Sequence, residues 1–141
     1  MTEPTPIGGP RIRRAPIPAD AVLVVRGESG SPSITRTQAQ RFLRAFPDWG
    51  RYGLSAFSAR DDSEVDDLSL HQLKAFGTLR LIRIVDLLDA GFEVVPTFRT
   101  PHVTIAFAGD LAGALDRFEN VESERRANRY HQQQPDTQEG R

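Results

Sequence analysis

The sequence predicts a single α+β domain with a mixed sheet of about five strands and about three to four helices. The chain has 141 residues, the usual size of one domain, and is 38% hydrophobic and 26% charged, enough for one core. Strand-like and helix-like apolar patterns alternate over residues 20–122 in the order β-α-β-α-β-α-β-β-α. The proline- and arginine-rich stretch 1–19 and the polar stretch 123–141 are predicted to be disordered arms.

The first half of this domain is predicted as strand, helix, strand. Residues 21–26 (AVLVVR) form a short apolar run, typical of a strand that is buried on both faces. Thr35 and Gln38 have the spacing of a capping box, so we expect the first helix to begin there. Pro47 should stop that helix, and residues 54–59 (LSAFSA) form the second predicted strand.

The middle of the chain is predicted to contain a second helix and an ambiguous segment. Ser63 is expected to cap this helix, apolar residues spaced over 65–76 give it a buried stripe, and Gly77 ends it. The segment 79–84 (LRLIRI) alternates like a strand but could also extend a helix. We favour a strand to about residue 83, then a short helix that Gly91 terminates.

The last part is predicted as two strands and a helix. Residues 92–98 and 102–108 read as strands, and the link between them is short enough for an antiparallel pair. Asp110 is placed to cap the final helix, whose buried face contains Leu115 and Phe118.

Composition excludes several classes of protein. The chain has no cysteine, so disulfides, thiolate metal sites and a cysteine nucleophile are excluded. The formal net charge of −1 argues against strong non-specific nucleic-acid binding. We expect a cytoplasmic protein with no membrane partner, because no apolar run approaches the roughly 18 residues of a transmembrane helix. No metal and no cofactor are predicted, and the oligomeric state stays open.

The segment 101–107 (PHVTIAF) offers one candidate site. His102 and Thr104 are two apart on a predicted strand and therefore point to the same face. There the imidazole could move a proton while the hydroxyl holds a phosphate oxygen. The segment resembles the His-x-Thr motif of two-histidine phosphoesterases, which process RNA ends and cyclic phosphates. That family uses two such motifs, and this sequence contains one.

A second candidate is an ordered set of polar residues on three predicted strands. Arg26 ends the first, Ser55 and Ser58 lie on the second, and Glu93 lies on a later one. Their order resembles that of ADP-ribosyltransferases. The resemblance implies an arginine that orders a dinucleotide, a serine that braces the site and a glutamate that contacts the ribose. Arginine suits a pyrophosphate, and a carboxylate suits a ribose hydroxyl.

A third candidate requires no catalysis. Trp49, Tyr52 and Phe57 surround a glycine-containing turn next to Arg51. If exposed, they would form an anchor for a protein partner or a stacking platform for a base. If buried, they would cap the core. Arg99 and His102, which flank Pro101, could add positive charge nearby if the loops cluster at one end of the sheet.

Two hypotheses follow from these residues. Because no complete catalytic set can be assembled, the sequence favours a non-catalytic interaction module that binds a protein partner through its folded domain. The alternative is a small, toxin-like effector enzyme acting on a nucleotide or RNA phosphate. In that case His102, Thr104, Arg26 and Arg99 would converge on one pocket, and nucleotide or RNA would be the partner.

Overall fold

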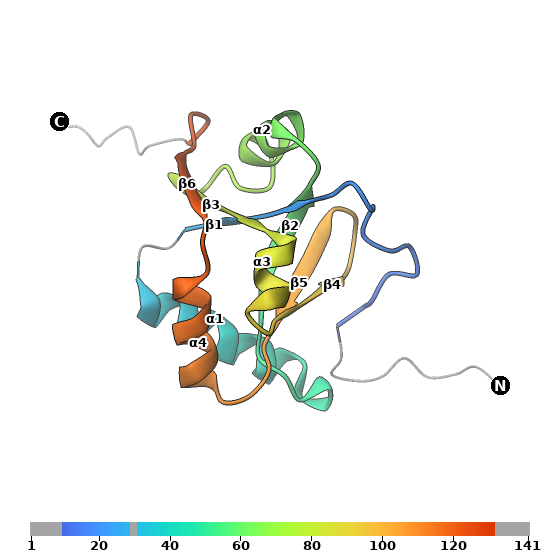
Figure 1. Cartoon of the computed structure of the whole chain (residues 1–141), viewed down its shortest axis with the longest axis vertical. Helices are drawn as coiled ribbons and strands as arrows, with labels where there is room; N and C mark the ends of the chain where they lie inside the picture. The colour runs from blue at the N-terminus through green and yellow to red at the C-terminus, as the bar shows by residue number, and fades with distance from the viewer. Residues whose placement is uncertain (1–9, 29–30, 132–141) are drawn as a thin grey trace.

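The computed structural model describes residues 10–28 and 31–131 and shows a six-stranded sheet in the order β4-β5-β2-β1-β3-β6 (Figure 1). The predicted α+β domain is confirmed, with one strand more than expected. The strands are β1 (Leu23–Gly27), β2 (Gly53–Ala59), β3 (Thr78–Arg83), β4 (Glu93–Pro96), β5 (His102–Ala106) and β6 (Glu124–Ala127). The helices are α1 (Pro32–Ala45), the 3₁₀ helix η1 (Pro47–Trp49), α2 (Asp62–Leu70), α3 (Ile84–Asp89) and α4 (Leu111–Asn120).

The sheet is antiparallel, so the prediction of a mixed sheet was wrong. Every strand pair in the described chain runs antiparallel. The reason is visible at the first connection, where α1 returns the chain to the strand position next to β1. There β2 pairs with β1 in the opposite direction, with Val25 opposite Phe57. Alternation of helices and strands therefore does not produce parallel neighbours here.

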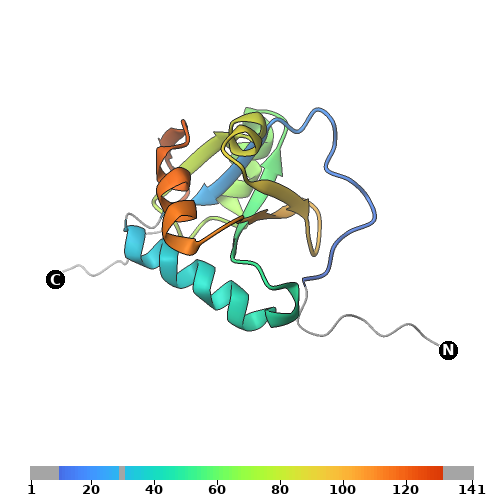
Figure 2. The ribbon, with the colours of Figure 1, turned by 60° about the horizontal axis from the view of Figure 1, so that its bottom comes forward.

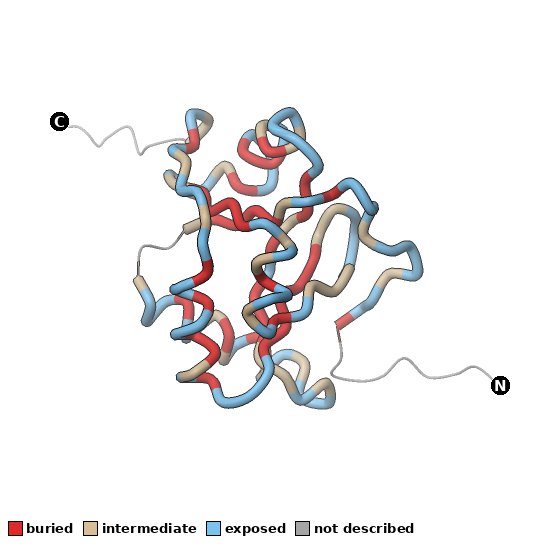
Figure 3. The backbone as a smooth tube through the Cα atoms, viewed as in Figure 1, coloured by how far each residue is buried: buried red, intermediate tan, exposed pale blue. Residues whose placement is uncertain are grey.

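Helices cover both faces of the sheet (Figure 2). The larger core cluster contains Val24 of β1 and residues from α1, α3 and α4, among them Phe118. The smaller cluster contains Val25 of β1 and residues of α2, among them Val65. Because consecutive residues of β1 enter opposite clusters, this strand is buried on both sides, as its continuous apolar sequence predicts (Figure 3).

The start of α1 differs from the prediction. The helix begins at Pro32 with Ser31 as its N-cap, so Thr35 lies inside the first turn and its hydroxyl donates to the Ser31 carbonyl at 3.4 Å. Proline fits the first helical position because its φ is already helical and its missing N–H is not needed there. The capping-box interpretation of Thr35 and Gln38 was therefore wrong.

The limits of α2 also differ from the prediction. Asp61, not Ser63, is the N-cap, and its carboxylate accepts from the Glu64 N–H at 3.0 Å. The helix ends at Leu70 rather than at Gly77. Leu73 nevertheless stays in the smaller core cluster, because a turn closed by its N–H on the Leu68 carbonyl redirects it toward the sheet. The buried apolar stripe that begins in α2 therefore continues into the turn after the helix.

The later elements agree with the sequence. The ambiguous segment forms β3 and then α3, and Gly91 has a φ of +94°, a conformation that glycine adopts without strain. β4 and β5 are antiparallel, although shorter than predicted. Asp110 caps α4 by accepting from the Gly113 N–H at 2.8 Å, and Phe118 faces the core.

The structure places part of the predicted polar tail in the sheet. Glu124–Ala127 forms β6 and pairs with β3. Just beyond it, the buried side-chain amide of Asn128 donates to the carbonyls of Ser69, Leu73 and Phe76 at 3.0–3.1 Å. These contacts anchor the segment around β6, whose sequence has too few apolar residues to indicate a strand. The remainder of the predicted tail, 132–141, lies outside the described residues.

The N-terminal arm follows the β4–β5 hairpin (Figure 1). Ile12 forms a bridge with Thr97, and the Phe98 N–H donates to the Arg11 carbonyl at 2.7 Å. The predicted arm therefore contacts the domain over its second half, and residues 1–9 lie outside the described part. Among the helices of the described chain, none combines the length and apolar character needed to span a membrane.

Candidate functional site

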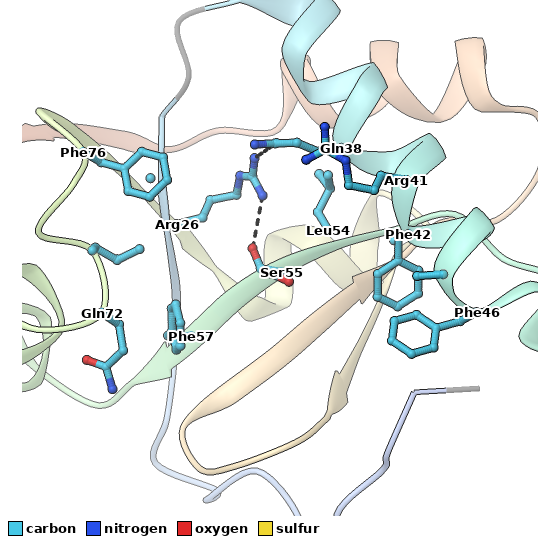
Figure 4. Close-up of a pocket in the computed structure, with 14 residues that line it drawn as sticks. Arg26, Gln38, Arg41, Phe42, Phe46, Leu54, Ser55, Phe57, Gln72 and Phe76 are labelled. Atoms are coloured by element: carbon cyan, nitrogen blue, oxygen red, sulfur yellow. Dashed lines mark hydrogen bonds between the residues drawn. The ribbon is translucent and has the colours of Figure 1, made fainter. Parts of the chain in front are cut away.

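A groove of about 370 Å³ opens where β1 ends and β2 begins (Figure 4). The C-terminal half of α1 forms one wall, the segment between α2 and β3 forms the other, and β1 and β2 form the floor. The lining residues are Arg26, Gly27, Gln38, Arg41, Phe42, Ala45, Phe46, Gly53, Leu54, Ser55, Phe57, Gln72, Leu73 and Phe76.

Arg26 is the buried charge of this groove. Its Nη1 donates to the Ser55 carbonyl at 3.1 Å and its Nη2 to Gln38 Oε1 at 2.8 Å (Figure 4). The residue is only 6% exposed. Burial lowers the pKa of Arg26 to about 10, although nearby Glu28 acts in the opposite sense. The guanidinium is therefore charged at neutral pH.

The counter-charge of Arg26 is missing from the described chain. Within residues 10–28 and 31–131, no carboxylate lies within ion-pair distance of its guanidinium. Burying a cation without a paired anion is unfavourable, and its two hydrogen bonds reach only neutral acceptors. An anionic group of a ligand that enters the groove would supply this partner.

Aromatic rings form much of the two walls. On the α1 side, the rings of Phe42 and Phe46 lie 4.9 Å apart. On the other side, Phe76 packs directly over Gly27, where a Cβ atom would overlap the phenyl ring. Phe57 of β2 also lines the groove, on the same side as Phe76 (Figure 4). The groove therefore combines apolar walls with a positive charge at its base, a pattern typical of ligand sites.

The polar groups of the groove suit binding better than catalysis. Among the described residues, its lining contains Ser55, two glutamines and two arginines, but no histidine, aspartate or glutamate. A serine hydroxyl needs an adjacent base to act as a nucleophile, and no described residue of the lining supplies one. The arrangement can hold an anion and pack against an apolar group, and its amides can bond to polar groups of the same ligand.

The structure brings only some of the predicted site residues together. Arg26 and the exposed Ser55 share the groove. Ser58 is buried on β2, and its hydroxyl donates to the Pro101 carbonyl at 3.3 Å. Glu93 lies outside the groove and forms an ion pair with Arg51 at 2.8 Å. The Arg-Ser-Glu set therefore does not share one pocket.

His102 and Thr104 belong to a hydrogen-bonded chain inside the domain. The hydroxyl of Thr97 lies 2.9 Å from His102 Nδ1 and 2.8 Å from the Thr104 hydroxyl. The pKa of His102 is lowered chiefly by burial, with a smaller contribution from Arg13. Thr104 is fully buried, so its hydroxyl is not presented to a phosphate. Arg99 lines a different cleft from Arg26.

The predicted aromatic cluster is divided between different surroundings. The Arg51 guanidinium lies 5.2 Å from the Trp49 ring, which in turn lies 5.7 Å from Phe42. Tyr52 packs on the larger core cluster, whereas Phe57 packs on the smaller one. Phe57 is the member that lines the groove, so the rings do not form one exposed anchor.

Sequence reasoning missed three groups that complete the groove: Gln38, Gln72 and Phe76. The helix and the turn that contain them are far apart in sequence, and only the fold brings them to the two sides of Arg26. One local signal was present. Gly27 directly follows Arg26 at the end of a buried strand, and a glycine there marks the close approach of another group, in this case the Phe76 ring.

The comparisons with known proteins and the search for metal sites give no further assignment. No protein-family model matches the chain, and no curated protein or solved structure does either. In the described part of the chain, no three histidine, aspartate or glutamate side chains come together as a metal site. The functional interpretation therefore depends on the geometry of the groove.

Proposed function

We propose that this protein is a non-catalytic interaction module that binds a short segment of a protein partner in the Arg26 groove. The observation that carries this proposal is the buried Arg26 guanidinium, which faces an open, aromatic-lined groove without a carboxylate partner among the described residues. A carboxylate of the partner would pair with it in a charge-assisted hydrogen bond.

The other lining groups define what the segment should carry. The Phe42, Phe46 and Phe76 rings favour an apolar side chain next to the carboxylate. The amides of Gln38 and Gln72 can donate to and accept from a peptide backbone. We therefore expect a segment in which an aspartate, glutamate or C-terminal carboxylate neighbours a bulky apolar residue.

The positions of the remaining candidates favour binding over catalysis. The enzymatic hypothesis requires Arg26, His102, Thr104 and Arg99 in one pocket, whereas only Arg26 lines this groove. A proton-transfer group must lie within hydrogen-bond reach of the atom it serves. The described lining of the groove contains groups that can recognise an anion, and it contains no group placed to transfer a proton.

Peptide selection tests this proposal. A phage-displayed library of random peptides is selected on the immobilised full chain, and bound sequences are compared with those retained by Ser55→Trp. Ser55 is exposed on the groove floor, so an indole there fills the groove without entering the core. The expected result is enrichment of peptides with a carboxylate beside an apolar side chain, and loss of their binding in the Ser55→Trp variant.

Ser63→Trp is the matched control. Ser63 is exposed near the start of α2 and does not line the groove, so this variant should retain the selected peptides. Circular dichroism verifies that both variants are folded. Peptides without acidic groups, or equal binding by both tryptophan variants, would contradict the proposal.

A further inference from the structure

A second cleft, separate from the Arg26 groove, lies between the N-terminal arm and the β4–β5 hairpin. Its volume is about 700 Å³, and four of its seven lining residues are arginines: Arg11, Arg13, Arg14 and Arg99. We propose that this arginine cleft binds the phosphate backbone of a single-stranded nucleic acid, with Phe98 as a stacking surface for a base.

The charge of the arginine cleft is not neutralised by the described chain. Across the residues that the structure places, no ion pair involves any of these four arginines. The opposite situation holds at α2 and β6, where Arg60, Arg126 and Arg129 pair with acidic side chains. The near-zero net charge therefore hides a strongly basic local surface, which is the electrostatic pattern of phosphate recognition.

The arginine cleft is also held in place. Arg13 Nη1 donates to the carbonyls of Thr97 at 2.9 Å and His102 at 2.6 Å, which fixes the arm against the hairpin. The Nε of Arg13 is buried and has no hydrogen-bond partner. Arg11, Arg14 and Arg99 are exposed, so their guanidinium groups can reach phosphates without disturbing the domain.

Phe98 favours a single strand over a duplex. It is 36% exposed at the hairpin turn and lines the arginine cleft. It also has a φ of +58°, an uncommon value for a bulky residue, and its N–H is bonded to Arg11. An accessible aromatic ring beside arginines provides base stacking together with backbone neutralisation, and the bases of a duplex are not available for such stacking.

Fluorescence anisotropy with a labelled oligouridylate of about 12 nucleotides tests the arginine cleft. The full chain should bind it, and the affinity should fall as the salt concentration rises from about 50 to about 200 mM, because counterions are released from the phosphates. Arg99→Gln should weaken binding by about fivefold and make the salt dependence shallower by about 0.7 in the log–log slope.

Arg83→Gln is the charge-matched control. Arg83 is exposed and lies outside the arginine cleft, so its removal should leave the affinity unchanged. Phe98→Ala should weaken binding of the single strand by about fivefold or more. Circular dichroism checks that each variant remains folded.

Three results would overturn the proposal. The first is no anisotropy change with the oligouridylate at low salt. The second is an equal loss of affinity in Arg99→Gln and Arg83→Gln. The third is binding of a duplex, or of phosphatidylglycerol vesicles, as tight as binding of the single strand, together with an unchanged affinity for the single strand in Phe98→Ala.

Discussion

Arg26 and Arg80 occupy almost equivalent places in the sheet. They are cross-strand partners in β1 and β3, and both are buried. Their guanidinium carbons lie 5.8 and 4.6 Å from the centre of the same ring, that of Phe118. Burial lowers the pKa of each.

The two arginines differ in what their N–H groups contact. Arg80 Nη2 donates to the carbonyls of Phe118 and Val121 at 2.8 and 2.9 Å, and its Nε donates to the Ser123 hydroxyl at 2.8 Å. The two carbonyls lie at the C-terminal end of α4, where the helix dipole favours a cation. Arg26 instead faces the groove. The two arginines therefore share their burial but differ in their acceptors, because the acceptors of Arg26 line the groove and the two carbonyl acceptors of Arg80 do not.

The largest effect is expected for Arg80→Met. This change leaves the carbonyls of Phe118 and Val121 and the Ser123 hydroxyl without their donor, because the methionine thioether carries no N–H. We expect the free energy of unfolding to fall by about 3 kcal/mol, measured by urea denaturation. If Arg80→Met lowered the free energy of unfolding as little as Arg26→Met does, the difference inferred between the two arginines would be contradicted.

Arg26→Met should separate stability from binding. It removes two hydrogen bonds whose acceptors, Ser55 and Gln38, line the open groove, where water can replace the guanidinium, so we expect a loss of only about 1 kcal/mol in the free energy of unfolding. Binding of the selected acidic peptides should be abolished. Urea denaturation and peptide titration on the same preparation check both parts, and retained binding would contradict the role given to Arg26.

Single hydrogen-bond partners give a finer comparison. Ser123→Ala removes the acceptor of the buried Arg80 Nε and should cost about 1 kcal/mol of unfolding free energy. Gln38→Met removes the acceptor of Arg26 Nη2, which lies beside an open groove where water can replace the amide. Its cost should stay within about 0.5 kcal/mol. Equal losses of unfolding free energy in Ser123→Ala and Gln38→Met, measured by urea denaturation, would indicate that the two sites are equally closed to water.

The smallest effect concerns the half-buried ring of His102, which takes up a proton at a pH where the arginines stay charged. Its pKa is lowered from the ordinary 6.5, so the unfolded chain binds more protons in the interval below 6.5 and stability rises with pH there. Unfolding midpoints should therefore fall as the pH drops from about 7 through this interval. His102→Asn should flatten this dependence, whereas His71→Asn, at an exposed position, should preserve it. If the pH dependence of the unfolding midpoint stayed the same in His102→Asn, the assignment of this dependence to His102 would be contradicted.

Local signals in the sequence were sufficient to predict several elements of the fold. The apolar strands, the Asp110 cap and the glycine at position 91 each act within a few residues, and the structure confirms them. β6 could not be predicted in this way. Its residues are polar, and its stability comes from pairing with β3 and from the Asn128 contacts to the turn after α2.

The candidate site was predictable only in part. Arg26 and Ser55 are identified by their strand positions, and they do lie in one groove. The sequence could not show that β5 places His102 in a hydrogen-bonded chain with Thr97, or that Arg26 has no carboxylate partner in the described chain. Both depend on contacts between distant segments, which residue types and spacing do not determine.

Phenylacetate is the smallest probe of the central claim, because it joins an aromatic ring to a carboxylate. Titrating it into the ¹⁵N-labelled full chain, followed by amide chemical shifts, tests whether Arg26 recognises an anion in the groove. The expected result is a saturable shift of the Gly27, Ser55 and Phe76 amides in the wild type that disappears in Arg26→Met. Equal shifts in both proteins, or shifts confined to residues outside the groove, would contradict it.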